Sequence, residues 1–170
     1  MSSRTFTPFP TLITERLTLR QLSIHDAQDI FALRSDPDIN KYLGRVPSKS
    51  VEEALNFIHI ITENIRKNES VYWVITLTDS NTFAGTICLF EFSDEHGQCE
   101  IGYELLSAFQ GKGIMQEAAK KVIEYAIQTL KVQTIEAFTH QNNLESIKLL
   151  EKLEFKKAGE VDGEYCVYKV

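Results

Sequence analysis

The sequence predicts one α/β (α+β) domain over residues 1–170, with a mixed, mostly antiparallel central sheet of about seven strands and helices on both faces. Two patterns lead to this prediction. In the middle of the chain, apolar and polar residues alternate between short turns, as in antiparallel strands joined into a meander. In the second half, strand-like segments alternate with segments of helical period, as in crossover units. With 43% hydrophobic residues, a chain of 170 residues can bury a sizeable core.

Each element follows from a local signal. Alternating β-branched residues predict a first strand within residues 11–20, and Ser23 is the expected N-cap of a helix over 25–34. A short turn starts at Asp36-Pro37 and runs through Tyr42. The other predicted elements are a helix from 48–50 to 67, strands 70–77, 83–92 and 99–105, a helix 114–129, a strand 134–139, a helix 142–153, and strands near 155–161 and 164–169.

Composition and charge narrow the class of protein. No apolar run approaches about 18 residues and the N-terminus lacks the apolar core of a signal peptide, so we expect a cytoplasmic protein without a membrane partner. The net charge of −6 argues against nucleic acid as the principal ligand and favours cationic substrates such as amines. The three cysteines and four histidines have no disulfide or metal spacing, and His140 is expected to be a solvated loop residue.

The most informative segment runs from Cys99 to Ala119. Apolar residues alternate up to Leu105, and a helical period begins after Gly113. The turn Gln110-Gly-Lys-Gly113 therefore lies where a strand leads into a helix. Unpaired backbone N–H groups and the helix dipole favour an anion there, and glycine lets the anion approach closely. The segment predicts a phosphate site made of backbone.

Two familiar phosphate motifs fit this turn poorly. A P-loop places Ser or Thr after its lysine, but Gly113 follows Lys112. A dinucleotide-binding fold places three glycines directly after the strand, but Gln116 stands at the third position and residues 107–109 intervene. Because a two-glycine turn alone is a weak signal, a plain strand–helix connection is the alternative.

Two further groups of polar residues are candidates for chemistry. With regular alternation, Glu100 and Glu104 share a strand face, where a carboxylate can take a proton directly or through water; the alternative is a solvated face. Further on, Asn142 stands three residues before Glu145, the spacing of a capping box. Ser146 would then lie in the first turn of the helix. The alternative is that Asn143 and Ser146 serve only in capping and solvation.

Taken together, these segments resemble the GCN5-related N-acetyltransferase (GNAT) superfamily. The segment Gln110–Met115 is similar to the cofactor motif Gln/Arg-x-x-Gly-x-Gly/Ala, with Met115 in place of the small last residue. A later family element is matched by Asn143–Ser146 and Leu150–Phe155, with Glu154 where the family has a helix-ending glycine.

The N-terminal half resembles one branch of that superfamily, the RimJ/RimL-like (ribosomal-protein-alanine N-acetyltransferase-like) enzymes. The similar segments are Leu12–Arg20, Asp26-Ala27, Arg34–Pro37, Lys41–Gly44 and Glu52–Ala54. The resemblance thus covers nearly the whole chain in order.

The resemblance implies that acetyl-CoA is the cosubstrate, that no metal is needed, and that the ligand lies where strand 99–105 splays from strand 134–139. Backbone groups of Leu105 and Ser107 would pair with the pantetheine arm, Asn143 would contact the same arm, and Ser146 would lie near the sulfur. The full implied cofactor-binding set is Leu105, Leu106, Ser107, Gln110, Gly111, Lys112, Gly113, Ile114, Met115, Gln116, Asn143 and Ser146.

The implied reaction is direct attack of a neutral primary amine on the thioester. Glu100, through water, is the first candidate for the base and Glu104 the second. The Leu105 N–H would polarise the carbonyl, and Ser146 would donate to the departing sulfur. A covalent mechanism is disfavoured because Cys99 and Cys166 fall on predicted strands.

The acceptor is less well specified. The branch implies that the acceptor is the N-terminal amine of a protein or peptide, with ribosomal proteins among the expected substrates. The alternative is an acetyltransferase for a polyamine or another small amine. An alternative of another class is a non-catalytic acyl-CoA-binding regulatory module. A homodimer is a further expectation, since dimers are common among proteins that resemble this one.

Overall fold

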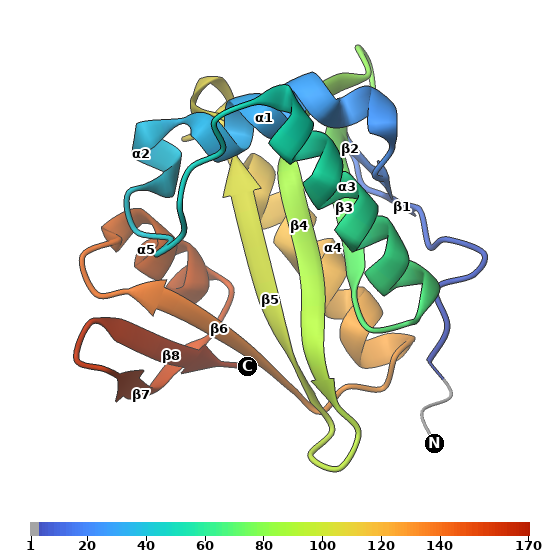
Figure 1. Ribbon diagram of the computed structural model, residues 1–170. Coiled ribbons are helices and arrows are strands. Elements are labelled where there is room, and N and C mark those ends of the chain that lie inside the picture. The colour runs from blue at the N-terminus through green and yellow to red at the C-terminus, as the bar shows by residue number, and fades with distance from the viewer. Residues whose placement is uncertain (1–3) are drawn as a thin grey trace.

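The computed structural model describes residues 4–170, whose strands form one eight-stranded sheet in the order β1-β2-β3-β4-β5-β6-β8-β7 (Figure 1). The strands are β1 Leu12–Ile13, β2 Leu17–Gln21, β3 Val71–Leu77, β4 Thr82–Ser93, β5 Gln98–Leu105, β6 Thr134–His140, β7 Lys156–Val161 and β8 Tyr165–Lys169. The helices are α1 Ala27–Ser35, α2 Pro37–Asn40, α3 Val51–Arg66, α4 Ile114–Gln128 and α5 Leu144–Lys152, with short 3₁₀ turns at Ile24–Asp26 and Ser107–Phe109.

The predicted mixed, mostly antiparallel sheet is confirmed. Strands β3, β4 and β5 form the expected meander, with Trp73 opposite Ile87 and Ile87 opposite Tyr103. The pairing of β5 with β6 is parallel, while the other neighbouring strands are antiparallel. Helices α1 and α3 cover one face of the sheet and α4 covers the other (Figure 1), so helices lie on both faces as predicted.

The sheet has one strand more than the expected count of about seven, because the segment predicted as one strand over 11–20 forms two, β1 and β2. The N–H of Thr14 donates to the Leu17 carbonyl at 2.9 Å, which closes a tight turn between β1 and β2. The carboxylate of Glu117, in α4, accepts from the Arg16 N–H at 3.0 Å and holds this turn against the helix. A contact between residues so far apart in sequence leaves no local signal of the break.

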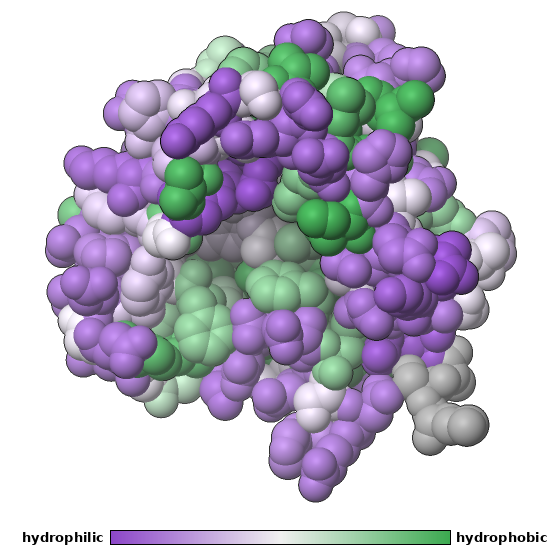
Figure 2. Space-filling view, viewed as in Figure 1, coloured by the Kyte–Doolittle hydropathy of each residue, from purple (hydrophilic) through white to green (hydrophobic). Residues whose placement is uncertain are grey.

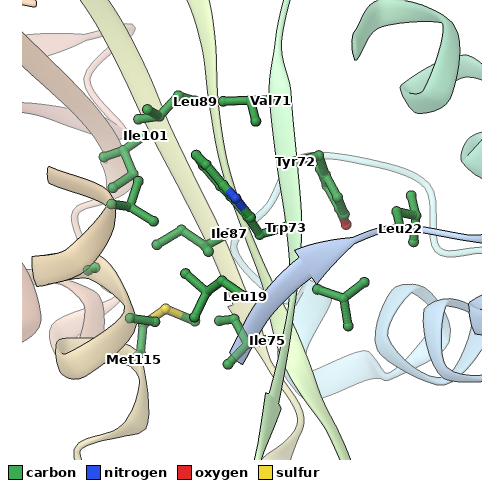
Figure 3. Packing of buried hydrophobic residues seen from close by; sticks show 14 of the residues in the cluster. Leu19, Leu22, Val71, Tyr72, Trp73, Ile75, Ile87, Leu89, Ile101 and Met115 are labelled. Atoms are coloured by element: carbon green, nitrogen blue, oxygen red, sulfur yellow. The ribbon is translucent and has the colours of Figure 1, made fainter. Parts of the chain in front are cut away.

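The core consists of two apolar layers separated by the sheet. Trp73 and Tyr72 lie on opposite faces of β3 (Figure 3). Trp73 is fully buried and packs edge-on against Tyr125 of α4, with ring centroids 5.7 Å apart. Tyr72 packs against Phe57 of α3 at 5.8 Å. Because helices cover both faces, β3 is buried along nearly its whole length.

The start of α5 differs from the predicted capping box. The N-cap is Asn143, whose Oδ1 accepts from the Ser146 N–H at 3.3 Å, so the prediction of Asn142 as the cap is wrong. The Asn142 N–H donates instead to Nδ1 of His140 at 3.1 Å, which extends the preceding turn by one residue. After the helix, Glu154 has φ +68°, the left-handed conformation for which the family resemblance implies a glycine.

The described cysteines are free thiols, and the pKa of both Cys88 and Cys99 is raised to about 12, first by burial. Such thiols stay protonated near neutral pH and are poor nucleophiles.

Among the described helices, none has both the length and the apolar composition that crossing a bilayer requires.

Candidate active site

Strands β5 and β6 pair along only part of their length. The parallel ladder joins Gln98–Glu100 to Thr134–Glu136, and the strands then diverge (Figure 1). From Ile101 to Leu105, β5 keeps β4 as its partner, and its other edge has no strand partner within residues 4–170. The splay expected between these two strands is therefore confirmed, and it leaves an open backbone edge beside the end of β5.

One backbone donor at this edge is well defined. The Leu106 N–H donates to the Ala84 carbonyl of β4 at 2.9 Å. Because successive residues of a strand direct their backbone groups to opposite edges, the Leu105 N–H points to the open edge. The Leu105 carbonyl accepts from Nε2 of Gln110 at 3.0 Å, which ties the end of the strand to the glycine turn.

Gly85 lies behind Leu105 and allows this arrangement. It is the register partner of Leu105 in β4, and a Cβ there would lie 2.2 Å from the Glu104 carbonyl oxygen and 2.9 Å from the Leu105 Cα. Both are backbone atoms, which cannot move aside as a flexible side chain can. This role could not be predicted from the sequence, because a glycine within a strand does not reveal which residue lies across from it.

The glycine turn has the geometry that the sequence predicted for an anion site. Gly111 and Gly113 have φ of +74° and +75°, and Gly113 is the N-cap of α4. The first helical bond runs from the Glu117 N–H to the Gly113 carbonyl at 3.1 Å, so the N–H groups of residues 114–116 precede the helical ladder. These groups and the helix dipole suit a pyrophosphate.

Arg16 and Glu117 hold the turn from behind. Nη1 of Arg16 donates to the Lys112 carbonyl at 3.0 Å, and its Nε pairs with Glu117 at 2.7 Å. Because a trans peptide directs its C=O and N–H in opposite directions, the Gly113 N–H points away from Arg16. Burial raises the pKa of Glu117, but hydrogen bonds from Thr14 and Arg16 outweigh it, so this pKa is lowered.

A cleft of about 800 Å³ joins the strand end, the glycine turn and α5. Most of the predicted site residues line it: Glu104, Leu105, Gln110, Gly111, Gly113, Ile114, Met115, Gln116, Asn143 and Ser146. Leu106, Ser107, Lys112 and Glu100 are not part of its lining. The cleft also includes Lys41, Tyr42 and Leu43, which follow α2 and were not predicted as site residues.

Tyr103 also lines the cleft, although it was not predicted as a site residue. Its hydroxyl lies 2.7 Å from Oγ of Ser146 in a hydrogen bond that joins β5 to α5. Burial raises the pKa of Tyr103 to about 12, against the opposing effect of the Ser146 bond, so the phenol stays protonated near neutral pH. Tyr103 occupies an apolar position of the strand alternation, and its partner is too distant in sequence for the pattern to reveal.

The two candidate bases share a strand face, as predicted, but have different surroundings. Glu104 lines the cleft and forms an ion pair with Arg45. Glu100 is the register partner of Glu136, and burial, then the charges of Glu91 and Glu136, raise its pKa. Five residues of strand, about 16 Å, separate Glu100 from Leu105. The structure thus brings Glu104 to the cleft and leaves Glu100 outside it.

His140 is not the solvated loop residue that was expected. It ends β6, stacks on Tyr42 with ring centroids 5.0 Å apart, and meets the edge of Tyr165 at 5.4 Å. The Tyr165 hydroxyl also donates to the Tyr42 carbonyl at 3.4 Å. These contacts attach the segment after α2 to β6 and β8, and so fix one wall of the cleft.

Comparison with known proteins agrees with this geometry. The profile of the Acetyltransferase (GNAT) domain family matches residues 16–156. The chain belongs to the GNAT acetyltransferases. The uncharacterized N-acetyltransferase p20 of Bacillus licheniformis is 37% identical over 150 residues, which are 88% of this chain and 84% of p20. The uncharacterized N-acetyltransferase YoaA of Bacillus subtilis is 32% identical over 151 residues, 89% and 85% of the two chains. The protein is therefore an N-acetyltransferase, and GNAT enzymes use acetyl-CoA.

Solved GNAT structures share the fold. A GNAT acetyltransferase from Bacillus anthracis superposes with a TM-score of 0.82 at 22% identity, covering 95% of this chain and 98% of that one. A spermidine N-acetyltransferase from Vibrio cholerae, solved with CoA and spermine, superposes with a TM-score of 0.80 at 20% identity, covering 92% and 96%. At these identities the likeness establishes the GNAT fold and leaves the acceptor to be argued from the site.

Proposed function

We propose that this GNAT enzyme acetylates the N-terminal amine of a protein or peptide, by direct attack of the amine on acetyl-CoA, as a RimJ/RimL-like enzyme of the cytoplasm. The observation that carries direct transfer is the open edge of β5 at Leu105, flanked by the glycine turn and by Ser146. A Bacillus subtilis relative, YdaF, supports the acceptor: it is 26% identical over 161 residues and has a provisional name as a ribosomal N-acetyltransferase.

The residues present fit acetyl-CoA. The N–H groups from Gly111 to Gln116 would hold the pyrophosphate, and the open edge at Leu105 would pair with the pantetheine arm as an added strand does. Asn143 would contact the same arm. It also caps α5, because its Oδ1 accepts from the Ser146 N–H. Acetyl-CoA supplies the acetyl group as a thioester. The CoA thiolate is a good leaving group, because a thiol has a pKa of about 8.5.

Two groups of the protein would act on the thioester. The Leu105 N–H would donate to the carbonyl oxygen and stabilise the negative charge that develops there, which is worth about 3 kcal/mol when well aligned. Ser146 would donate a proton to the departing sulfur. The Tyr103 hydroxyl, 2.7 Å from Oγ of Ser146, positions that serine for the transfer.

The attacking amine must first lose a proton. An N-terminal amine, with a pKa of about 8, is neutral in roughly a tenth of molecules at pH 7, so a weak base suffices. Glu104 is the better placed of the two predicted bases because it lines the cleft, and we propose that it accepts this proton through water. Glu100 would act only through a chain of several waters.

Thiol release from acetyl-CoA tests the function against three kinds of acceptor: peptides that begin with Ala or Ser, spermidine, and peptides with an internal lysine. We expect release with the first kind. Release with spermidine alone would replace the peptide by a polyamine, the acceptor of the Vibrio cholerae enzyme of the same fold. Thermal stabilisation by acetyl-CoA with no transfer to any amine would favour a binding module.

A further inference from the structure

Two arginines meet on the Glu104 face of the sheet. Arg34 comes from the last turn of α1, and Arg45 comes from the segment between α2 and α3. Nε of Arg45 donates to Oδ1 of Asn40 at 2.7 Å, and its Nη2 pairs with Glu104. The Arg34 guanidinium lies over the ring of Phe57, 3.8 Å from the centroid. Arg45 is therefore in contact with a residue that lines the cleft, and the charges of Arg45 and Glu104 both act on Arg34.

The positive charge of Arg34 has no negative partner of its own. Within residues 4–170, no carboxylate lies at ion-pair distance from Arg34, and the acidic group that acts on it, Glu104, is already paired with Arg45. Burial, then the charge of Arg45, lower the pKa of Arg34. A guanidinium has five N–H donors, and those of Arg34 have no acceptor within residues 4–170, so they are available to an anionic ligand.

Both arginines are held in place before any ligand arrives. Phe57 packs against one face of Arg34, which leaves the edge with its N–H groups accessible. Arg45 is held by Asn40, a buried residue whose Nδ2 donates to the carbonyls of Leu33 and Asp36 at 3.1 and 2.7 Å. A site fixed in this way loses little conformational entropy when it binds.

The open end of β5 is reached from a hollow in the surface on the side that Glu104 faces. Figure 2 shows this face of the molecule hollowed over β4 and β5, with hydrophilic side chains along the upper edge, below the segment that joins α1 to α3. Glu104 faces this side, whereas Tyr103 and Ser146 lie on the opposite side of the same strand. Neither arginine is part of the cleft lining: Arg45 contacts it through the ion pair with Glu104, and Arg34 lies close enough to that pair for both charges to act on it.

We propose that Arg34, supported by Arg45, binds a carboxylate of the acceptor, so that the substrate is a primary amine with a carboxylate close by. The proposal rests on the proposed function and specifies its acceptor. Two arginines and one glutamate leave one net positive charge, which matches a single carboxylate better than a phosphate ester of nearly two negative charges. The carboxylate can belong to an acidic side chain near a peptide N-terminus or to a free amino acid.

The test compares acceptors that differ only in this charge. The peptides Ala-Asp, Ala-Asn and Ala-Lys, each with the same following residues and an amidated C-terminus, are assayed by thiol release beside free alanine and aspartate. We expect kcat/KM to be at least tenfold higher for Ala-Asp than for Ala-Asn. Arg34→Gln is expected to remove this preference, and Arg34→Lys to keep part of it, because lysine retains the charge without the fork of donors. Arg66→Gln, on the exposed side of α3, is the matched control and keeps the preference.

The outcomes separate this inference from the proposed function. Equal rates for the three peptides, or an Asp preference that survives Arg34→Gln, would overturn the inference and leave peptide acetylation standing. A preference for the free amino acids would support the carboxylate site and replace the peptide acceptor. If Arg34→Gln does not fold, the wild-type series and Arg34→Lys decide.

Absence of transfer to every acceptor would count against the proposed function alone. The inference is then judged by thermal shift with CoA and an N-acetylated Ala-Asp amide or Ala-Asn amide. A larger shift with the Asp compound, reduced in Arg34→Lys, supports the carboxylate site, and equal shifts overturn it.

Discussion

The two ends of strand β5 carry the same kind of acid in different surroundings. At the first end, Glu100 is flanked by paired strands on both edges and faces two further glutamates, Glu91 and Glu136. At the other end, Glu104 lies where the strand has lost one neighbour, beside the open backbone of Leu105. The divergence of β5 from β6, more than the residue type, therefore determines which of the two carboxylates lies at the cleft.

The largest expected effect distinguishes these two glutamates. Glu104→Gln is expected to lower kcat about 100-fold at pH 7, the scale of a lost general base, while Glu100→Gln changes kcat by less than about threefold. Steady-state thiol release with an Ala-started peptide measures both. A large loss of kcat in Glu100→Gln with little change in Glu104→Gln would identify Glu100, the first candidate from the sequence, as the base. Circular dichroism must show that Glu104→Gln still folds, since it leaves Arg45 without its carboxylate.

The next effect concerns the opposite face of the same strand end. Ser146→Ala is expected to lower kcat tenfold or more because the departing sulfur loses its proton donor. Tyr103→Phe removes only the bond that positions Ser146, so a smaller loss of a few-fold is expected. Ser80→Ala, in the exposed turn before β4, serves as the control. A wild-type kcat in Ser146→Ala would remove this serine from the mechanism.

A smaller effect tests the backbone that holds Leu105 at the open edge. Gly85→Ala would place a Cβ 2.2 Å from the Glu104 carbonyl oxygen, so strand β5 has to shift. We expect stability to fall by about 1–3 kcal/mol, the usual effect of overpacking, and KM for acetyl-CoA to rise. Gly159→Ala is the matched control, because among the described atoms none lies within 4 Å of a Cβ at that position. Equal effects of the two substitutions would show that Gly85 has no special part in the site.

Local patterns predicted most of the elements and the glycine turn, because alternation, helical period and turn chemistry act over a few residues. Contacts between distant segments could not be predicted in this way. The Tyr103–Ser146 bond joins residues 43 apart in sequence, and the cluster of Arg34, Arg45 and Glu104 joins three separate segments. The net charge of −6 favoured cationic substrates, yet the charges beside the cleft point to a carboxylate.

The smallest expected effect is on stability at the paired end of β5. Burial and the charges of Glu91 and Glu136 raise the pKa of Glu100 in the folded protein above its value in the unfolded chain. The folded state therefore binds the Glu100 proton more tightly, and this contribution to stability is fully present below the unfolded pKa and is lost as the pH rises through the folded one. At pH 7 the ionised Glu100 destabilises the fold, so Glu100→Gln is expected to raise the melting temperature slightly, with a gain that shrinks as the pH approaches about 4.3. Glu95→Gln, in the exposed turn between β4 and β5, removes the same charge without burial or paired strands and is expected to show no such pH dependence. If both variants respond alike, the change in melting temperature comes from the net charge of the protein, and the surroundings of Glu100 at the paired end of β5 do not contribute to it.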